Sequence, residues 1–260
     1  MQLNYEPPVA ISSERGSFYF SCTFIQQYDR IRHMILYVVA TPIGNLADCS
    51  PRAIKILSEA TLVIAEDTRT TGQLFKLLGI EGKKQFLSSH AQSSASSMDR
   101  ALEACKEHEV IALVTDAGTP AISDPGSFFI SHFRAMYPEV PVVPVPGPSA
   151  VIAALSVSGF ASSHFEFLGF IPHKKGRQTL FQSLQEKDHT VVMYESPHRI
   201  MKTLETLAEV LDERLIMVGR EMTKTFEEYP VLTAKAMLQY YTEHSDKVRG
   251  EFVIVISPRV

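Results

Sequence analysis

From residue 36 onward, short apolar runs alternate with segments in which apolar residues recur at helical spacing. Short apolar runs bounded by turn-forming residues are typical of buried strands, and longer periodic segments are typical of amphipathic helices. In the first half of the chain the pattern predicts strands at residues 36–40, 62–65, 86–87, 110–114 and 140–145, and helices at 51–60, 72–78, 96–108, 127–137 and 149–157. This alternation indicates an α/β fold in which a parallel sheet carries helices on both faces.

The pattern changes after the polar step at residues 161–164. Further strands are predicted at 165–170, 190–194, 214–218 and 250–257, and helices at 178–187, 200–211 and 234–244. The segment 225–232 is expected to add an antiparallel strand. We therefore predict two α/β domains, each with a mostly parallel or mixed sheet flanked by helices: an N-terminal domain at 34–159 and a C-terminal domain at 164–260.

The first 33 residues differ from the rest because they lack clear hydrophobic periodicity. They contain Ser, Gly, Pro and isolated aromatic residues. Terminal segments of this kind are seldom tied to the core. Residues 1–33 are therefore expected to form a flexible or weakly docked extension.

The overall composition excludes several classes of protein. Hydrophobic residues make up 45% of the chain and the formal net charge is −4, so the chain is not a polycation that coats nucleic acid without specificity. The three cysteines form no CxxC pair and no HExxH motif occurs, so neither a disulfide framework nor a metal site is expected. No apolar run approaches the roughly 18 residues of a membrane helix. A cytoplasmic protein is expected.

Turn-forming and functional residues follow most of the predicted strands. In open α/β sheets, ligands bind beyond the carboxyl ends of the strands. The segments at these positions are Thr41-Pro-Ile-Gly-Asn45, Glu66-Asp-Thr-Arg69, Ser88-Ser-His90, Thr115-Asp-Ala-Gly-Thr-Pro120, Pro146-Gly-Pro-Ser-Ala150, Tyr194-Glu-Ser-Pro-His-Arg199 and Gly219-Arg-Glu-Met-Thr-Lys224. Any one of them is as readily an ordinary turn, but seven on one rim indicate a site.

Common nucleotide and hydrolase motifs are absent or incomplete. No GxGxxG follows a strand and no GxxxxGK[ST] occurs, so neither a classical dinucleotide site nor a P-loop is supported. The segment 147–151 resembles a nucleophile elbow around Ser149, but Val151 replaces its second glycine. Asp67 and Asp116 remain open as an acid/base or metal pair. The small residues around Gly118 instead suit a loop whose main chain closely approaches a polar ligand.

Taken together, these loops resemble those of the tetrapyrrole-methylase superfamily, in the branch that methylates ribose 2′-hydroxyls of small-subunit ribosomal RNA. The resemblance extends from about residue 36 to residue 256. It rests on Val39-Ala-Thr-Pro-Ile-Gly-Asn-Leu46, Ala65-Glu-Asp-Thr-Arg69, Asp116-Ala-Gly-Thr-Pro-Ala-Ile122, Asp124-Pro-Gly126, Tyr194-Glu-Ser-Pro-His-Arg199 and Gly219-Arg-Glu-Met-Thr-Lys224. It implies a two-domain fold with S-adenosyl-L-methionine in the cleft between the domains.

By motif position, the resemblance also implies which residues contact the methyl donor. These are Pro42, Asp116, Gly118, Thr119, Ile122, Ser149, Ala150, Glu195 and Glu221. A ribose hydroxyl is a poor nucleophile, so a base or polarising group would help; the candidates are Asp67, His90 and Lys224, with Glu195 and His198 as further ones. Asn45, Glu66, Arg69 and Arg199 are expected to bind substrate, the arginines by gripping phosphate. For both arginines the alternative is a solvated or ion-paired side chain, and this alternative is favoured more for Arg199 than for Arg69.

The expected activity is 2′-O-methylation of a cytidine in 16S ribosomal RNA, within the 30S subunit, by a homodimer. Two alternatives stay open: a porphyrin-type small-molecule methyltransferase, and a non-catalytic paralogue that binds the methyl donor. The RNA-type loop sequences favour the first of the three.

Overall fold

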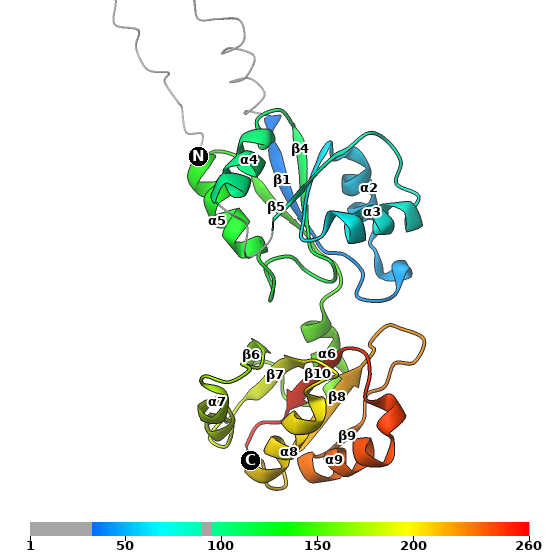
Figure 1. The fold of residues 1–260 in the computed structure, drawn as a ribbon, viewed down its shortest axis with the longest axis vertical. Coiled ribbons are helices and arrows are strands. Elements are labelled where there is room, and N and C mark those ends of the chain that lie inside the picture. The colour runs from blue at the N-terminus through cyan, green and yellow to red at the C-terminus, as the bar shows by residue number, and fades with distance from the viewer. Residues whose placement is uncertain (1–32, 90–94, 260) are drawn as a thin grey trace, which may run out of the picture.

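The computed structural model describes residues 33–89 and 95–259. The expected extension, apart from its last residue, and His90 lie outside the described residues. Two α/β domains lie end to end (Figure 1). Within the described ranges, no helix is long and apolar enough to cross a membrane.

The first sheet is entirely parallel, as the alternation of strands and helices predicts. Its strand order is β3-β2-β4-β1-β5. The strands are β1 (Ile35–Val39), β2 (Leu62–Ala65), β3 (Gln85–Ser88), β4 (Val110–Val114) and β5 (Val142–Val145). All five predicted strands are therefore present; β2 and β4 have the predicted bounds, and the bounds of the other three differ by one or two residues.

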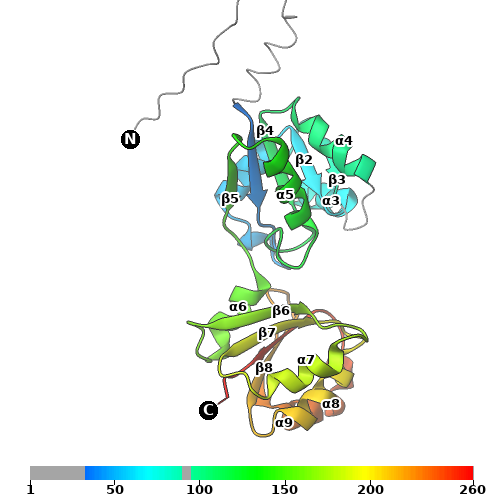
Figure 2. The same cartoon turned by 90° about the vertical axis from the view of Figure 1, so that its left-hand side faces the viewer.

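Helices cover both faces of this sheet (Figures 1 and 2). Helices α2 (Pro51–Glu59) and α3 (Thr68–Leu77) pack on one face, where Val63 and Ala112 point. Helices α4 (Ala95–Cys105) and α5 (Gly126–Met136) pack on the other, where Ile64 and Ile111 point. Neighbouring strand residues thus bury their side chains in opposite cores, which explains why the strands are apolar throughout.

The second sheet is mixed and has the order β6-β7-β10-β8-β9. Its strands are β6 (Phe165–Phe170), β7 (Thr190–Glu195), β8 (Leu215–Arg220), β9 (Val231–Thr233) and β10 (Phe252–Ile256). Only β6 and β7 are parallel neighbours; the other pairs are antiparallel. The antiparallel strand predicted at 225–232 is only partly present: β9 overlaps it at 231–232, and Glu228 forms an isolated antiparallel bridge with Arg220. Helices α7 (Arg177–Leu184), α8 (Ile200–Val210) and α9 (Ala234–Glu243) cover one face of the sheet.

Helix α6 (Ala150–Ser158) packs on the other face of the second sheet, which differs from the expected domain boundary. Its Val151, Ala154 and Leu155 share a core with Val192 and Val253. The sequence-based boundary at 159–164 placed this helix in the first domain. We place the connection between the domains at 146–149 instead, because the buried contacts of α6 lie with the second sheet.

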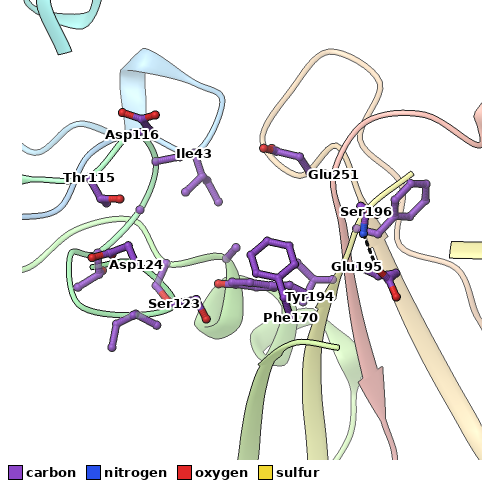
Figure 3. Close-up of a pocket in the computed structure, with 18 of the residues that line it drawn as sticks. Ile43, Thr115, Asp116, Ser123, Asp124, Phe170, Tyr194, Glu195, Ser196 and Glu251 are labelled. Atoms are coloured by element: carbon purple, nitrogen blue, oxygen red, sulfur yellow. Dashed lines mark hydrogen bonds between the residues drawn. The ribbon is translucent and has the colours of Figure 1, made fainter. Parts of the chain in front are cut away.

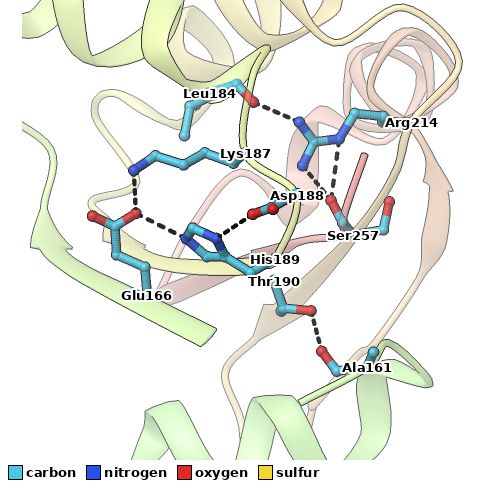
Figure 4. Close-up of polar contacts among 9 residues, drawn as sticks. All are labelled: Ala161, Glu166, Leu184, Lys187, Asp188, His189, Thr190, Arg214 and Ser257. Atoms are coloured by element: carbon cyan, nitrogen blue, oxygen red, sulfur yellow. Dashed lines mark hydrogen bonds and ion pairs between the residues drawn. The ribbon is translucent and has the colours of Figure 1, made fainter. Parts of the chain in front are cut away.

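A group of polar contacts closes the edge of the second sheet where β6 and β7 begin (Figure 4). Glu166 accepts from Nζ of Lys187 at 2.6 Å and lies 3.3 Å from Nε2 of His189. The guanidinium of Arg214 donates to the carbonyl oxygens of Leu184 and Ser257. These contacts hold the end of the sheet at which β6, β7 and β8 begin and β10 ends.

Candidate active site

A pocket of about 410 Å³ lies between the two domains. The first domain lines it with Glu66, which follows β2, and with residues 115–119, which follow β4. The second domain contributes residues 194–197 at the end of β7 and residues 251–253 at the start of β10. Figure 3 shows Thr115 and Asp116 on one side and Tyr194 and Glu251 on the other. The pocket therefore occupies the crevice beyond the carboxyl ends of the parallel strands, where such sheets bind ligands.

The loop around Gly118 presents its main chain to the pocket. Gly118 and Thr41 exchange two backbone hydrogen bonds, of 2.9 and 3.1 Å, which fix the loop against the end of β1. The φ angle of Gly118 is +87°, a region that favours glycine. A Cβ atom there would also lie 3.4 Å from Cγ2 of Ile43. Another residue would be strained by the backbone conformation, and side-chain atoms beyond Cβ would press on Ile43 at the pocket wall.

The charge of the pocket is acidic. Carboxylate residues in its lining are Glu66, Asp116, Asp124, Glu195 and Glu251. The described lining residues include no Lys, Arg or His. Glu195 and Glu251 are ion-paired with Arg199 and Lys224, whereas Glu66 and Asp124 form no ion pair within the described residues. The carboxylates of Glu66 and Asp124 therefore favour a ligand that carries positive charge.

Asp124 has a carboxylate oxygen that lacks a partner. Its Oδ1 accepts from the backbone N–H groups of Ala121 and Gly126, at 2.9 and 2.7 Å. Its Oδ2 is buried and has no hydrogen-bond partner among residues 33–89 and 95–259. A buried acceptor without a partner is costly, so this pocket residue is suited to receive a donor from a ligand.

Hydrogen bonds join the acidic loop that follows β2 to the acidic loop that follows β4. Glu66 accepts a 2.6 Å hydrogen bond from Oγ1 of Thr115, and Asp116 accepts a 3.1 Å hydrogen bond from the N–H of Asp67. Asp67 and Asp116, predicted as a possible functional pair, are therefore in contact. No group of three or more potential metal ligands is present in the described part of the chain.

Asp67 caps helix α3 and is poorly suited to act as a base. Its carboxylate accepts from the backbone N–H and from the guanidinium of Arg69, at 2.8 and 2.7 Å. The side-chain hydrogen bond from Arg69 is the largest cause that holds the pKa of Asp67 far below its usual range. Asp67 thus stays ionised and is a weak proton acceptor. The side chain of Arg69 is 90% exposed, although its guanidinium is ion-paired with Asp67.

Lys224 is ion-paired with two glutamates of the second domain. Its Nζ lies 2.8 Å from Oε1 of Glu221 and 2.9 Å from Oε2 of Glu251. Burial disfavours the ammonium ion, but hydrogen bonds to Glu221 and Glu251 outweigh burial and raise the pKa of Lys224. Lys224 is therefore a cation at neutral pH, able to donate a hydrogen bond but not to accept a proton.

Glu195 and Arg199 form a buried ion pair behind the pocket wall. Oε1 of Glu195 lies 2.8 Å from Nη2 of Arg199, and Oε2 accepts a 2.6 Å hydrogen bond from Thr203. Nη1 of Arg199 donates to the carbonyl oxygen of Ile171 at 2.7 Å. The alternative weighed for Arg199, an ion-paired structural arginine, fits this placement better than a phosphate contact does.

The comparisons with known proteins agree with this geometry. Residues 35–237 match the model of the tetrapyrrole (corrin/porphyrin) methylases. The chain belongs to this family. Among curated methylases, it is 42% identical over 224 residues to ribosomal RNA small subunit methyltransferase I of Haemophilus influenzae, which covers 85% of this chain and 78% of the relative. It is 44% identical to the protein of the same name from Neisseria meningitidis, covering 86% of this chain and 76% of the relative.

Solved structures of other methylases share the fold. Cobalt precorrin-4 methyltransferase superposes with a TM-score of 0.64 at 16% identity, covering 87% of this chain and 96% of that structure. Diphthine synthase superposes with a TM-score of 0.67 at 14% identity, covering 87% and 90%. The predicted two-domain methylase fold is confirmed.

The methyl donor of this family is S-adenosyl-L-methionine. When bound, the donor supplies an electrophilic methyl group on a cationic sulfonium. The pocket fits such a molecule: its lining is acidic, Asp124 offers an unpartnered acceptor, and Ile43 and Phe252 supply apolar surface. Its volume also lies in the usual range for small-molecule sites, roughly 300–1,000 Å³.

The structure places most of the predicted donor contacts in this methylase pocket. Those that line it are Asp116, Gly118, Thr119, Ile122, Ser149, Ala150 and Glu195. Pro42 and Glu221 are not among the lining residues; Glu221 is linked to the lining residue Glu251, whose backbone N–H donates to Oε1 of Glu221 at 3.0 Å. Of the predicted substrate contacts, Glu66 lines the pocket, whereas the side chain of Asn45 accepts from the N–H of Ala47 at 3.0 Å and caps a short 3-10 helix (Leu46–Asp48).

The sequence assigned no role to several pocket residues. Ile43 and Tyr194 lie in the segments expected at the rim, and Asp124 lies in a motif of the family resemblance, but none of the three was predicted as a contact. Phe170, Glu251 and Phe252 lie in none of these segments. Phe170 ends a predicted strand, so the last residue of each strand was also a candidate. Glu251 and Phe252 lie at the start of an antiparallel strand, which the rule for parallel sheets does not cover.

Proposed function

We propose that this methylase transfers a methyl group from S-adenosyl-L-methionine to the ribose 2′-hydroxyl of a cytidine in 16S ribosomal RNA. The observation that carries the proposal is the 42–44% identity, over most of the chain, to proteins named ribosomal RNA small subunit methyltransferase I. The 2′-hydroxyl as acceptor follows from the sequence resemblance described above.

The pocket supports this chemistry chiefly by alignment. Methyl transfer requires the acceptor oxygen, the methyl carbon and the leaving sulfur to lie in line. Holding the two reactants in that geometry can contribute several kcal/mol. Neither Asp67 nor Lys224 is suited to accept the proton of the hydroxyl. We propose that Lys224 acts as a positioned cation at the acceptor side, and that Arg69 is available to a phosphate of the RNA.

The proposal also covers the form of the RNA substrate, the cellular compartment and the oligomeric state. The substrate is an RNA segment presented by the 30S subunit in the cytoplasm, and the methylase acts as a homodimer. Exposed apolar side chains support self-association, among them Phe128 of α5 and Ile152 of α6, which are 53% and 56% exposed. Isolated apolar residues are common on surfaces, so sedimentation equilibrium is the appropriate test of the dimer.

A methyl-transfer assay with alternative acceptors tests the proposed function. Tritium-labelled donor would be incubated with the methylase and either 30S subunits from a strain that lacks the modification or a porphyrin precursor. The proposal predicts label in 16S RNA and none in the precursor. Label that enters only the precursor would overturn the proposal in favour of a small-molecule methylase. Calorimetry that shows donor binding, with label entering neither acceptor, would favour a non-catalytic paralogue.

A further inference from the structure

A basic loop follows β6 at the mouth of the pocket. Phe170 ends β6, lines the pocket and is 57% exposed. The next exposed residues include His173, Lys174 and Lys175, and the loop from 171 to 176 has no acidic residue. Consecutive Cα atoms are about 3.8 Å apart, so Lys174 lies within roughly 15 Å of Phe170 along the chain. The loop therefore places positive charge beside an acidic pocket.

The basic side chains of this loop do not stabilise the fold through polar contacts. Across residues 33–89 and 95–259, no hydrogen bond or ion pair engages the side chains of His173, Lys174 or Lys175. Many other cations on this protein are paired, such as Lys187 with Glu166 and Lys247 with Glu228. Lys174 and Lys175 are thus free to contact an anion.

Both ends of the loop are anchored to the buried wall of the pocket. At its start, the carbonyl oxygen of Ile171 accepts from Arg199, which is ion-paired with Glu195. At its end, Nη2 of Arg177 donates to Thr203 at 2.9 Å, and Nη1 of Arg177 lies 3.9 Å from Oε2 of Glu195. Thr203 also donates to Glu195. The buried carboxylate of Glu195 therefore contacts the residues that hold both ends of the loop. The lysines therefore sit on a loop whose position is fixed relative to the pocket.

The exposed ring of Phe170 adds a second feature that suits RNA. Its edge-on contact with Tyr194, at a centroid distance of 5.3 Å, holds the ring at the pocket mouth. Exposed aromatic rings stack on the bases of single-stranded RNA, and lysines contact the phosphates that connect them. The pocket lining itself offers no cation, so attraction of an RNA strand has to come from the rim.

We propose that Phe170, Lys174 and Lys175 form the surface that binds the acceptor RNA strand, with the lysines on its phosphates and Phe170 against a base next to the target nucleotide. This inference rests on the proposed function. It assigns to Arg199 the role of a positioning residue, which fixes the loop that bears the RNA-contacting cations.

The test compares two double variants of the full-length methylase. K174Q/K175Q removes the two proposed phosphate contacts. K55Q/K83Q removes the same charge from two exposed residues, Lys55 on α2 and Lys83 before β3, which do not line the pocket. Initial rates on 30S subunits that lack the modification would be measured at several salt concentrations, and donor affinity by calorimetry.

The proposal predicts that K174Q/K175Q lowers kcat/KM for 30S subunits by about tenfold or more, while K55Q/K83Q and donor affinity stay near the wild-type values. The salt dependence should weaken as well. The slope of log kcat/KM against log salt concentration should become less steep by about 0.7 for each phosphate that a lysine no longer neutralises. F170L should lower kcat/KM more than F170Y does, because tyrosine retains the stacking surface.

Specific outcomes would overturn the inference. Equal kcat/KM in the two double variants would show that the loop is only a solvated charged segment. Weaker donor binding in K174Q/K175Q would show an effect through the pocket, and a loss of self-association would show that the loop contacts protein. The wild-type methylase serves as the separate check: if it labels no RNA, the proposed function itself fails.

Discussion

Gly44 of the first domain lies directly against Lys224 of the second. A Cβ atom added at Gly44 would come within 2.5 Å of Cγ of Lys224 and 2.9 Å of Oγ1 of Thr223. Thr223 has a φ angle of +66°, which is uncommon for a β-branched residue and indicates a constrained loop. The two domains thus approach one another closely next to the pocket, at a position where only glycine fits.

Substitution of Gly44 tests this interdomain contact. Gly44→Ala should displace Lys224 from Glu251, because the added methyl group takes the space of its side chain. We expect methyl transfer to fall by about tenfold, since misplacement of reacting groups by an ångström is costly. Gly72→Ala is the control: Gly72 lies within α3 and an added Cβ meets nothing within 4 Å, so stability should rise by up to ~1 kcal/mol. Unchanged activity in Gly44→Ala would show that the contact has no role in the reaction.

A second prediction concerns the loop that carries Gly118. Gly118→Val should weaken donor binding by about tenfold, or ~1.4 kcal/mol, because the side chain crowds Ile43 at the pocket wall. Gly79→Val is matched for backbone strain, since Gly79 also has a positive φ, of +66°, but faces open space. Both variants should lose stability. Calorimetry should find weaker donor binding in Gly118→Val alone, and equal affinity in the two would remove this loop from the donor site.

The third prediction separates a cation from a base at Lys224. The raised pKa keeps Lys224 protonated at neutral pH. Lys224→Arg should then retain a substantial part of kcat, whereas Lys224→Gln should lose tenfold or more. If Lys224 were the general base, both variants would be equally inactive, because arginine does not deprotonate in proteins. The stability that Lys224 supplies through its raised pKa is present below the usual lysine pKa and is lost as pH rises through the pKa of the folded protein. At the acid end, protonation of Glu221, whose pKa is lowered, also removes the ion pair.

A fourth prediction uses the polar group at the far edge of the second sheet. The hydrogen bond from Lys187 is the largest cause of the lowered pKa of Glu166. A lowered carboxyl pKa stabilises the fold above the pKa of the unfolded chain, and this contribution disappears as pH falls. Below about pH 4.5, the melting temperature of the wild type should therefore fall more than the melting temperature of Glu166→Gln. Parallel curves for the two proteins from pH 7 to pH 3 would contradict the prediction.

Much of the fold could be predicted because the strands are apolar on both faces. Val63 and Ile64 illustrate this, since they enter opposite cores and leave no polar position in β2. The start of α3 was missed because its first turn, Thr68-Arg-Thr-Thr71, has no apolar residue, and the helix begins there through the cap at Asp67. The partner of α6 could not be predicted because that helix is apolar almost all round, so its pattern does not show which sheet it covers.

The pocket residues could be predicted where their position depends on the main chain at the end of a strand, as for Gly118 and Ser149. The role of a side chain was harder to predict where it depends on hydrogen-bond and ion-pair partners. Arg199 had the chemistry to grip a phosphate, yet its guanidinium is engaged by Glu195 and the carbonyl of Ile171. Only the tertiary structure shows that these donors are already used. The same structure shows that the side chains of Lys174 and Lys175 have no hydrogen-bond or ion-pair partner within the part of the chain that it describes.

The central claim is that the acceptor is a ribose 2′-hydroxyl of small-subunit RNA, and the position of the transferred methyl group tests it most directly. After labelling of 30S subunits with tritiated donor, the 16S RNA would be hydrolysed in alkali. Alkali cannot cleave the chain next to a 2′-O-methylated ribose, because cleavage requires a free 2′-hydroxyl. The account predicts that the label is recovered in an alkali-resistant dinucleotide whose 5′ residue is cytidine. Label recovered in mononucleotides, on a base, would contradict it.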